Sequence, residues 1–226
     1  MPSKARVAFN KNAEDIERLL EIHATIGGDA KGRRYQLEVL NKSAVVLVTA
    51  IWEAYCEDIA AEALDHIIAN VPNASALPKE LMKRIARDIK AEPNELAMWD
   101  LADGGWKTRV KNRLAALTAE RNRRLNTPRS ENIDQLFSSA IGLLSVSESW
   151  SWTNMPTQTA KDKLDKYVSL RGAIAHRGKG GASVKKVNVE EYFEHVKRLV
   201  RKTGGKVNSF VRKVTGKSLW ARLTKA

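Results

Sequence analysis

The amino-acid sequence predicts an all-α protein, a helical bundle arranged around one long central helix. Apolar residues recur at three- and four-residue spacing in segment after segment, as they do in amphipathic helices. No segment of useful length alternates between apolar and polar residues in the manner of a half-buried strand. One segment, residues 35–71, is apolar on every face between Ala44 and Ile51, which is typical of a helix at the centre of a bundle.

The other helices are predicted from the same periodicity and from residues that start and stop helices. The expected segments are residues 12–26, 35–71, 79–91, a short turn at 95–101, 106–125, 133–144, 161–177 and 189–202. Gly27 and Gly28 end the first helix, and Pro78 stands at the start of the third. Ser130 is expected to cap the helix that carries Phe137 and, at its end, Leu144 on its apolar side.

Two units are expected, a helical domain at residues 1–202 and a basic C-terminal arm at residues 203–226. From His195 to the end the chain has no Asp or Glu, while Lys and Arg contribute ten positive charges interleaved with apolar residues such as Phe210 and Trp220. Such a segment is either a basic amphipathic arm for RNA or a tail that docks on the core.

Composition narrows the class of protein. The formal net charge of +13 predicts an anionic partner, with nucleic acid first and a membrane surface as the weaker alternative. The single cysteine, Cys56, excludes an internal disulfide and is expected to be a small packing residue in a reducing cytoplasm. The chain opens without an apolar core of signal-peptide length, and its most apolar run, residues 43–52, is about half of what spans a bilayer. We therefore expect a soluble cytoplasmic protein.

The strongest local concentration of charge is at residues 107–129, where eight cations face the single acid Glu120. A charge run is usually a solvated face, but this excess of one sign favours a surface that binds a polyanion. The candidate RNA-binding residues are Arg121, Arg123, Arg124, Arg177 and Lys179.

The best candidates for chemistry are Arg171 and His176 in the predicted helix 161–177. On a helical wheel Arg171 falls in the middle of an apolar face that includes Tyr167 and Ile174. An arginine there is costly unless a carboxylate or a phosphate meets it. His176 lies near the helix C-terminus, where the helix dipole favours the protonated imidazole. Glu53, or failing it Glu57, is a candidate buried counterion for Arg171, although Glu53 equally fits a solvent-facing position.

Other kinds of site find no support in the sequence. It has no triphosphate loop, no dinucleotide fingerprint and no His/Cys cluster at zinc spacing, so we expect neither a cofactor nor a metal. His66 near Glu62 and Asp65 is weak evidence for a metal, and His23 and His195 have no partner at ligand spacing. Trp150 and Trp152 either stack on bases or, more commonly, plug the edge of a helical core.

Three stretches of this chain resemble one family. The first is SLRGAIAHRG, which is similar to the Arg-x4-His motif of HEPN domains, all-helical modules of which many are metal-independent ribonucleases. The second and third are VLVTAIWEAYCEDIAAEAL and LNTPRSENIDQLFSSAIGLL with the SWSW that follows, which resemble segments of the RiboL-PSP branch. The resemblance extends over roughly residues 35–180.

This resemblance implies roles for matching residues. Arg171 would steady the scissile phosphate, His176 would move protons, and Glu53 would orient Arg171. One departure is Gly172, because many active members carry Asn, Asp or His after the arginine. The departure bears on catalytic efficiency rather than on RNA binding.

The chemistry of RNA cleavage without a metal leads to a symmetric dimer. The reaction needs a base for the 2′-OH proton, an acid for the leaving 5′-oxygen, and a cation against the phosphorane charge. One motif supplies one histidine and one arginine, so two motifs facing across a two-fold axis supply the full set. The leading hypothesis is therefore an endoribonuclease homodimer joined through the motif helix, in the manner of a toxin or antiphage effector with an antitoxin or defence-system partner.

Two other functional hypotheses remain open. One is a non-catalytic HEPN dimer that binds RNA or protein, with Arg171 and His176 serving the interface. The other is a protein that binds DNA or a membrane surface through its basic tail.

Overall fold

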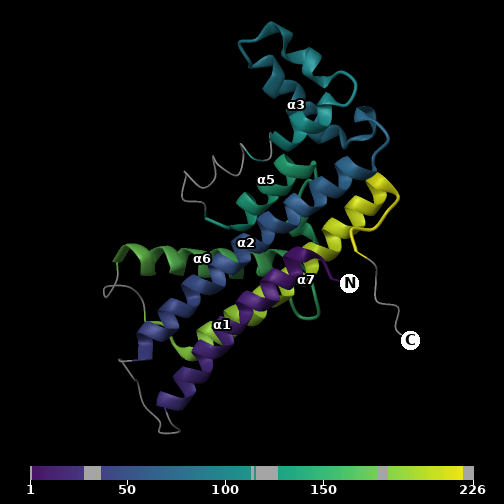
Figure 1. The fold of residues 1–226 in the computed structure, drawn as a ribbon. Coiled ribbons are helices and arrows are strands. Elements are labelled where there is room, and N and C mark those ends of the chain that lie inside the picture. The colour runs from purple at the N-terminus through teal and green to yellow at the C-terminus, as the bar shows by residue number, and fades with distance from the viewer. Residues whose placement is uncertain (1, 28–36, 113–114, 116–126, 178–182, 221–226) are drawn as a thin grey trace, which may run out of the picture.

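The computed structural model describes residues 2–27, 37–112, 115, 127–177 and 183–220 (Figure 1). Its helices are α1 (Lys4–Gly27), α2 (Glu38–Asn70), α3 (Lys79–Lys90), α5 (Ser130–Ile141), α6 (Thr157–Arg177) and α7 (Lys186–Thr215), with 3-10 turns η2 (Ala74–Ala76), η3 (Glu95–Leu101) and η4 (Val146–Ser149). Residues 105–112 are also helical. The described residues contain no strand, which confirms the predicted all-α class.

Helix α2 is the central element, and α1 and α7 lie along it (Figure 1). Helix α7 is parallel to α2: Asn41 Nδ2 donates to the carbonyl of Val184, and Tyr55 Oη donates to the carbonyl of Val200, both at 3.0 Å. Helix α1 packs on α2 with the ring of Phe9 edge-on to Tyr55 at 5.8 Å between centroids. The predicted central helix is confirmed, because its sides are covered by several other helices.

Helix α1 begins at Lys4, well before the predicted start at residue 12. Its first backbone N–H groups have no partner within the helix. The carboxylate of Glu62 on α2 accepts from the backbone N–H of Lys4 at 3.2 Å and of Ala5 at 3.1 Å, and Ser3 Oγ accepts from Arg6 N–H. Because the main cap comes from a distant helix, local sequence signals did not reveal the early start.

Helix α5 departs from the prediction at both ends. Its N-cap is Arg129, Ser130 is the first helical residue, and no side chain of the cap accepts a hydrogen bond. The expected capping by Ser130 is wrong; Asp165 of α6 accepts from both the backbone N–H and the hydroxyl of Ser130, at 2.8 and 2.9 Å. The helix ends at Ile141 and is capped by Gly142 with φ of 76°, so Leu144 lies beyond it and is 55% exposed rather than buried.

Helix α7 is longer than predicted and passes through the expected boundary at residue 202 without a break. Thr203, Val207 and Val211 are buried in the same core as the rest of the helix. Beyond the helix, the backbone N–H of Leu219 donates to Asn208 Oδ1 at 2.8 Å. Residues 203–220 therefore dock on the bundle, which was one of the two expected arrangements of the tail.

The two tryptophans after α5 pack against different parts of the bundle, Trp150 against Trp52 of α2 and Trp152 against His195 of α7. Trp150 is fully buried, and its indole N–H donates to Thr203 Oγ1 at 2.9 Å. Trp152 is only partly exposed and its ring lies 5.5 Å from the His195 ring. His195 is 3% exposed, and its Nε2 lies 3.0 Å from the carbonyl of Ala160. These residues pack the core, and neither tryptophan offers an open stacking platform.

Candidate active site

The C-terminal part of α6 carries Arg171 and His176, and the backbone of both is helical. The side chain of Arg171 is partly buried. The side chains of His176 and Arg177, and all of Arg121, Arg123, Arg124 and Lys179, lie outside the described residues.

A pair of stacked tyrosines lies beside Arg171. Tyr167 precedes Arg171 by four residues, so both project from one face of α6. The ring of Tyr167 stacks on that of Tyr192 in α7, with centroids 4.2 Å apart and an interplanar angle of 12°. This stack joins the motif helix to the parallel pair of α2 and α7.

The hydroxyl of Tyr192 has a defined hydrogen-bond direction. Thr49 Oγ1 lies 3.0 Å from Tyr192 Oη and also donates its single proton to the carbonyl of Val45 at 2.9 Å. With that proton in use, Tyr192 donates to Thr49. The lone pairs of the Tyr192 oxygen therefore stay available as acceptors.

The electrostatics of this cluster explain how Arg171 is accommodated. Burial raises the pKa of Tyr192 far above its usual value, and the positive charge of Arg171 acts in the opposite direction. Burial and the nearby Glu191 carboxylate raise the pKa of Tyr167 to about 12. Both phenols are neutral at pH 7, so Arg171 lies beside a polar but uncharged group.

Carboxylates contribute little to the immediate surroundings of Arg171. Within the part of the chain that the structure describes, no carboxylate oxygen lies at ion-pair distance from its guanidinium. Glu53 is partly buried one turn beyond Thr49 on α2 and has polar or electrostatic contacts of its own. The orientation of Arg171 by Glu53 stays a prediction, as does the substitute role of Glu57.

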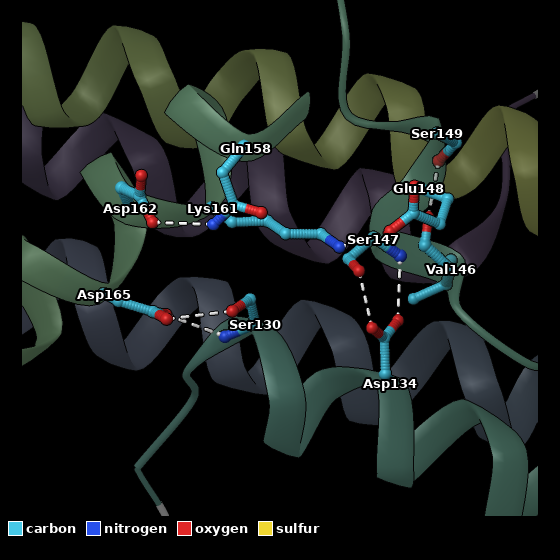
Figure 2. Close-up of polar contacts among 10 residues, drawn as sticks. All are labelled: Ser130, Asp134, Val146, Ser147, Glu148, Ser149, Gln158, Lys161, Asp162 and Asp165. Carbon is cyan, nitrogen blue, oxygen red and sulfur yellow. Dashed lines mark hydrogen bonds and ion pairs between the residues drawn. The ribbon is translucent and has the colours of Figure 1, made fainter. Parts of the chain in front are cut away.

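The N-terminal part of α6 is fixed to its neighbours by paired hydrogen bonds (Figure 2). Figure 2 shows Asp165 of α6 reaching Ser130 at the start of α5, and Asp134 of α5 accepting from the backbone N–H of Ser147 in η4 at 2.8 Å. Lys161 of α6 binds Glu148 of η4. The contacts of Lys161 and Asp165 precede Arg171 in α6, so they fix the part of the helix from which the motif end projects.

Replacing Tyr192 by phenylalanine tests the hydrogen bond that anchors this cluster. Tyr192→Phe is expected to lower the free energy of unfolding by about 1 kcal/mol, because a fully buried hydrogen bond to Thr49 is lost. Tyr167→Phe is the matched control, since it keeps the ring stack and loses only a long 3.5 Å contact to Glu191. Urea unfolding of both variants gives the comparison, and equal losses would contradict the assigned role of Tyr192.

The chain matches the model of one protein family. The model of the RiboL-PSP-HEPN family matches residues 10–209. The chain belongs to this family. The match extends over most of α1 and through α7 to residue 209, so it is longer than the stretch of residues 35–180 recognised in the sequence. No curated protein and no solved structure gave a significant match.

None of the helices in the described residues is long and apolar enough to cross a membrane. Across the same residues, no group of three or more His, Cys, Asp or Glu side chains is placed to hold a metal ion, and His66 Nε2 is buried without a hydrogen-bond partner. The expectation that His66 holds no metal stays a prediction.

Sequence reasoning missed Thr49 and Tyr192 as neighbours of the motif. Tyr167 was visible, because it falls on the same helical face as Arg171. Thr49 and Tyr192 are 143 residues apart in the chain, and each reads as an ordinary core-facing residue of a helix. Only the parallel packing of α2 and α7 brings them together.

Proposed function

We propose that the protein is a metal-independent HEPN endoribonuclease that acts as a homodimer joined through α6. The observation that carries this proposal is Arg171, a partly buried cation set beside the neutral phenol of Tyr192 at the motif end of α6. A guanidinium placed this way keeps its charge for an anionic ligand, and a phosphate is the ligand that its geometry suits.

The proposed reaction is attack of the ribose 2′-oxygen on the adjacent phosphorus. One His176 imidazole takes the proton from the 2′-OH, and the new P–O2′ bond forms as the P–O5′ bond breaks. An imidazolium, His176 of the second subunit, protonates the leaving 5′-oxygen. Arg171 stabilises the negative charge of the phosphorane. The products are a 2′,3′-cyclic phosphate and a 5′-hydroxyl, with Glu53 orienting Arg171.

The surface of α6 near the motif suits contact with a second copy. Ala175 is exposed, and Leu170 and Ile174 are only partly buried, so apolar groups flank the motif. In the dimer these side chains would be covered while two motifs come together. Arg121, Arg123, Arg124, Arg177 and Lys179 are the proposed RNA contacts around the shared cleft. A cytoplasmic toxin or antiphage effector, with an antitoxin or defence-system partner, is the role we propose.

Incubation with total RNA in the presence of a chelator tests the enzyme. Wild-type protein is expected to cleave RNA and leave 2′,3′-cyclic phosphate ends, whereas Arg171→Ala is expected to cleave at least 100-fold more slowly. Retained RNA binding without cleavage by either protein selects the rival function, a non-catalytic HEPN dimer that binds RNA. Equal cleavage by both proteins shows that Arg171 has no part in the chemistry.

Gly172 is the specific observation that favours the rival function, and its surroundings make it testable. A Cβ added at Gly172 would meet no atom within 4 Å, so packing does not require glycine there. Gly172→Asn is expected to raise the cleavage rate about tenfold, since one added hydrogen bond to a phosphate contributes roughly 1.5 kcal/mol. Gly172→Ala is the control, because it also replaces glycine by a better helix former, the better of the two, without adding an amide. Equal rates for both variants would show that a polar group there has no effect.

A further inference from the structure

The outer face of the C-terminal half of α7 carries a continuous row of positive charges. We define the α7 stripe as Arg198, Arg201, Lys202, Lys206, Arg212 and Lys213. At 100° per residue these side chains fall within a sector of about 140°, and at 1.5 Å per residue they extend over about 22 Å. All are exposed except Lys202, which is partly exposed.

Among the residues that the structure describes, no carboxylate forms an ion pair with the α7 stripe. The last acid in the chain is Glu194, which pairs with Lys197 just before the stripe begins. In the described residues, none of the six cations has an ion-pair partner. Like charges one turn apart, such as Arg198 with Lys202 and Lys202 with Lys206, repel each other by a few tenths of a kcal/mol per pair. The face therefore carries an unfavourable self-repulsion that a bound polyanion would relieve.

The same stretch of α7 shows what kind of surface the stripe can meet. Its apolar residues face the bundle: Val207 and Val211 are fully buried, and Phe210 and Val214 are partly buried against the core. The centre of the stripe holds Gly205 and Ser209, both exposed, and a Cβ at Gly205 would meet nothing within 4 Å. A helix that binds a lipid surface needs apolar side chains to insert, and this face has none. An exposed row of cations without apolar side chains instead suits binding to the phosphate backbone of a nucleic acid.

We propose that the α7 stripe binds the phosphate backbone of RNA without reading its sequence. This inference rests on the proposed function in taking RNA as the polyanion. It adds a second contact surface, on a different face of α7 from Tyr192, that holds the strand while α6 carries out the chemistry. Neutralising the stripe should therefore raise Kd and KM and leave kcat unchanged.

The test measures binding of the wild-type chain to a fluorescent 20-nucleotide 2′-O-methyl RNA, which cannot be cleaved by attack of a 2′-OH. A triple variant, Arg198→Gln, Arg201→Gln and Lys206→Gln, is compared with a matched triple, Lys11→Gln, Arg18→Gln and Lys79→Gln. The control positions are also exposed and lose the same charge. Glutamine suits an exposed helix position, so both triples should keep the wild-type melting temperature or exceed it.

The stripe triple is expected to raise Kd at least tenfold at 100 mM salt, and the control triple less than threefold. The slope of log Kobs against log[salt] should fall by about 2 in the stripe triple, since each lost phosphate contact removes about 0.7 for a single strand. Equal effects of the two triples would overturn the proposal. The proposal would also be overturned if the stripe triple kept the wild-type affinity for RNA but lost the binding to phosphatidylserine vesicles that the wild type shows.

The failure of this proposal is separable from failure of the nuclease. If the wild type binds the RNA through the stripe but never cleaves natural RNA, the RNA-binding role of the stripe is supported and the nuclease proposal is contradicted. If Arg171→Ala abolishes cleavage while the stripe triple keeps the wild-type Kd and KM, the nuclease proposal is supported and the RNA-binding role of the stripe is contradicted.

Discussion

A mixed dimer of one wild-type and one His176→Ala subunit is expected to lose most of its RNA cleavage rather than half of it. The proposed reaction uses the imidazole of one subunit as the base and that of the other as the acid, so removing either should lower the rate about 10²- to 10⁴-fold. Two independent sites would instead leave the mixed dimer with half of the wild-type rate. We therefore expect its cleavage rate to fall at least tenfold below that of the wild type.

The measurement needs mixed dimers of known composition. The two kinds of subunit carry different affinity tags, and tandem purification isolates the mixed species before the cleavage assay. A mixed dimer with about half of the wild-type rate would show that each subunit uses its own histidine. Wild-type dimers that carry both tags and are isolated in the same way serve as the control.

The elements near the motif show how much a sequence reveals of such a site. The helical period alone places Tyr167, Arg171 and Ile174 on one face of a helix, and the structure keeps that order in α6. The family motif was recognisable from SLRGAIAHRG for the same reason, because it is local. Contacts between helices could not be predicted in this way, because the partners of each residue depend on how the helices pack, and a single sequence does not show this.

Two carboxylates illustrate the contacts that sequence reasoning missed. Glu62 and Asp165 lie within helices, yet each accepts hydrogen bonds from the N-terminus of a different helix. Their helical periodicity gives no indication of this role. Both also shift a helix boundary, at Lys4 and at Ser130, so one missed tertiary contact accounts for an error in a neighbouring element.

His195 carries the second large prediction, a loss of stability in mild acid. Its Nε2 faces the carbonyl of Ala160, which only accepts, so Nε2 carries the proton of the neutral ring. Burial lowers the pKa of His195 from 6.5 to about 4, and the charge of Lys163 acts in the same direction, against the hydrogen bond to Ala160. The imidazole of His195 is therefore protonated near pH 6.5 in the unfolded chain but only near pH 4 in the folded chain.

The sign of the effect follows from this difference in proton binding. The contribution of His195 to stability is fully present above pH 6.5 and is lost as the pH falls toward 4, with a total of about 3 kcal/mol. At pH 5 the loss is already about 2 kcal/mol. His195→Gln keeps a donor for Ala160 and cannot titrate, so it should not show this part of the pH dependence.

Urea unfolding of the wild type and His195→Gln at pH 7.5 and pH 5.0 measures the difference directly. The gap between the two proteins should shift by about 2 kcal/mol in favour of the glutamine variant on acidification, because titration of all other groups cancels. An unchanged gap would mean that His195 takes up its proton without unfolding the core. The His195→Gln variant also separates stability from chemistry. Because it lacks the loss of stability caused by His195, a fall in its cleavage rate below pH 6 reports on His176.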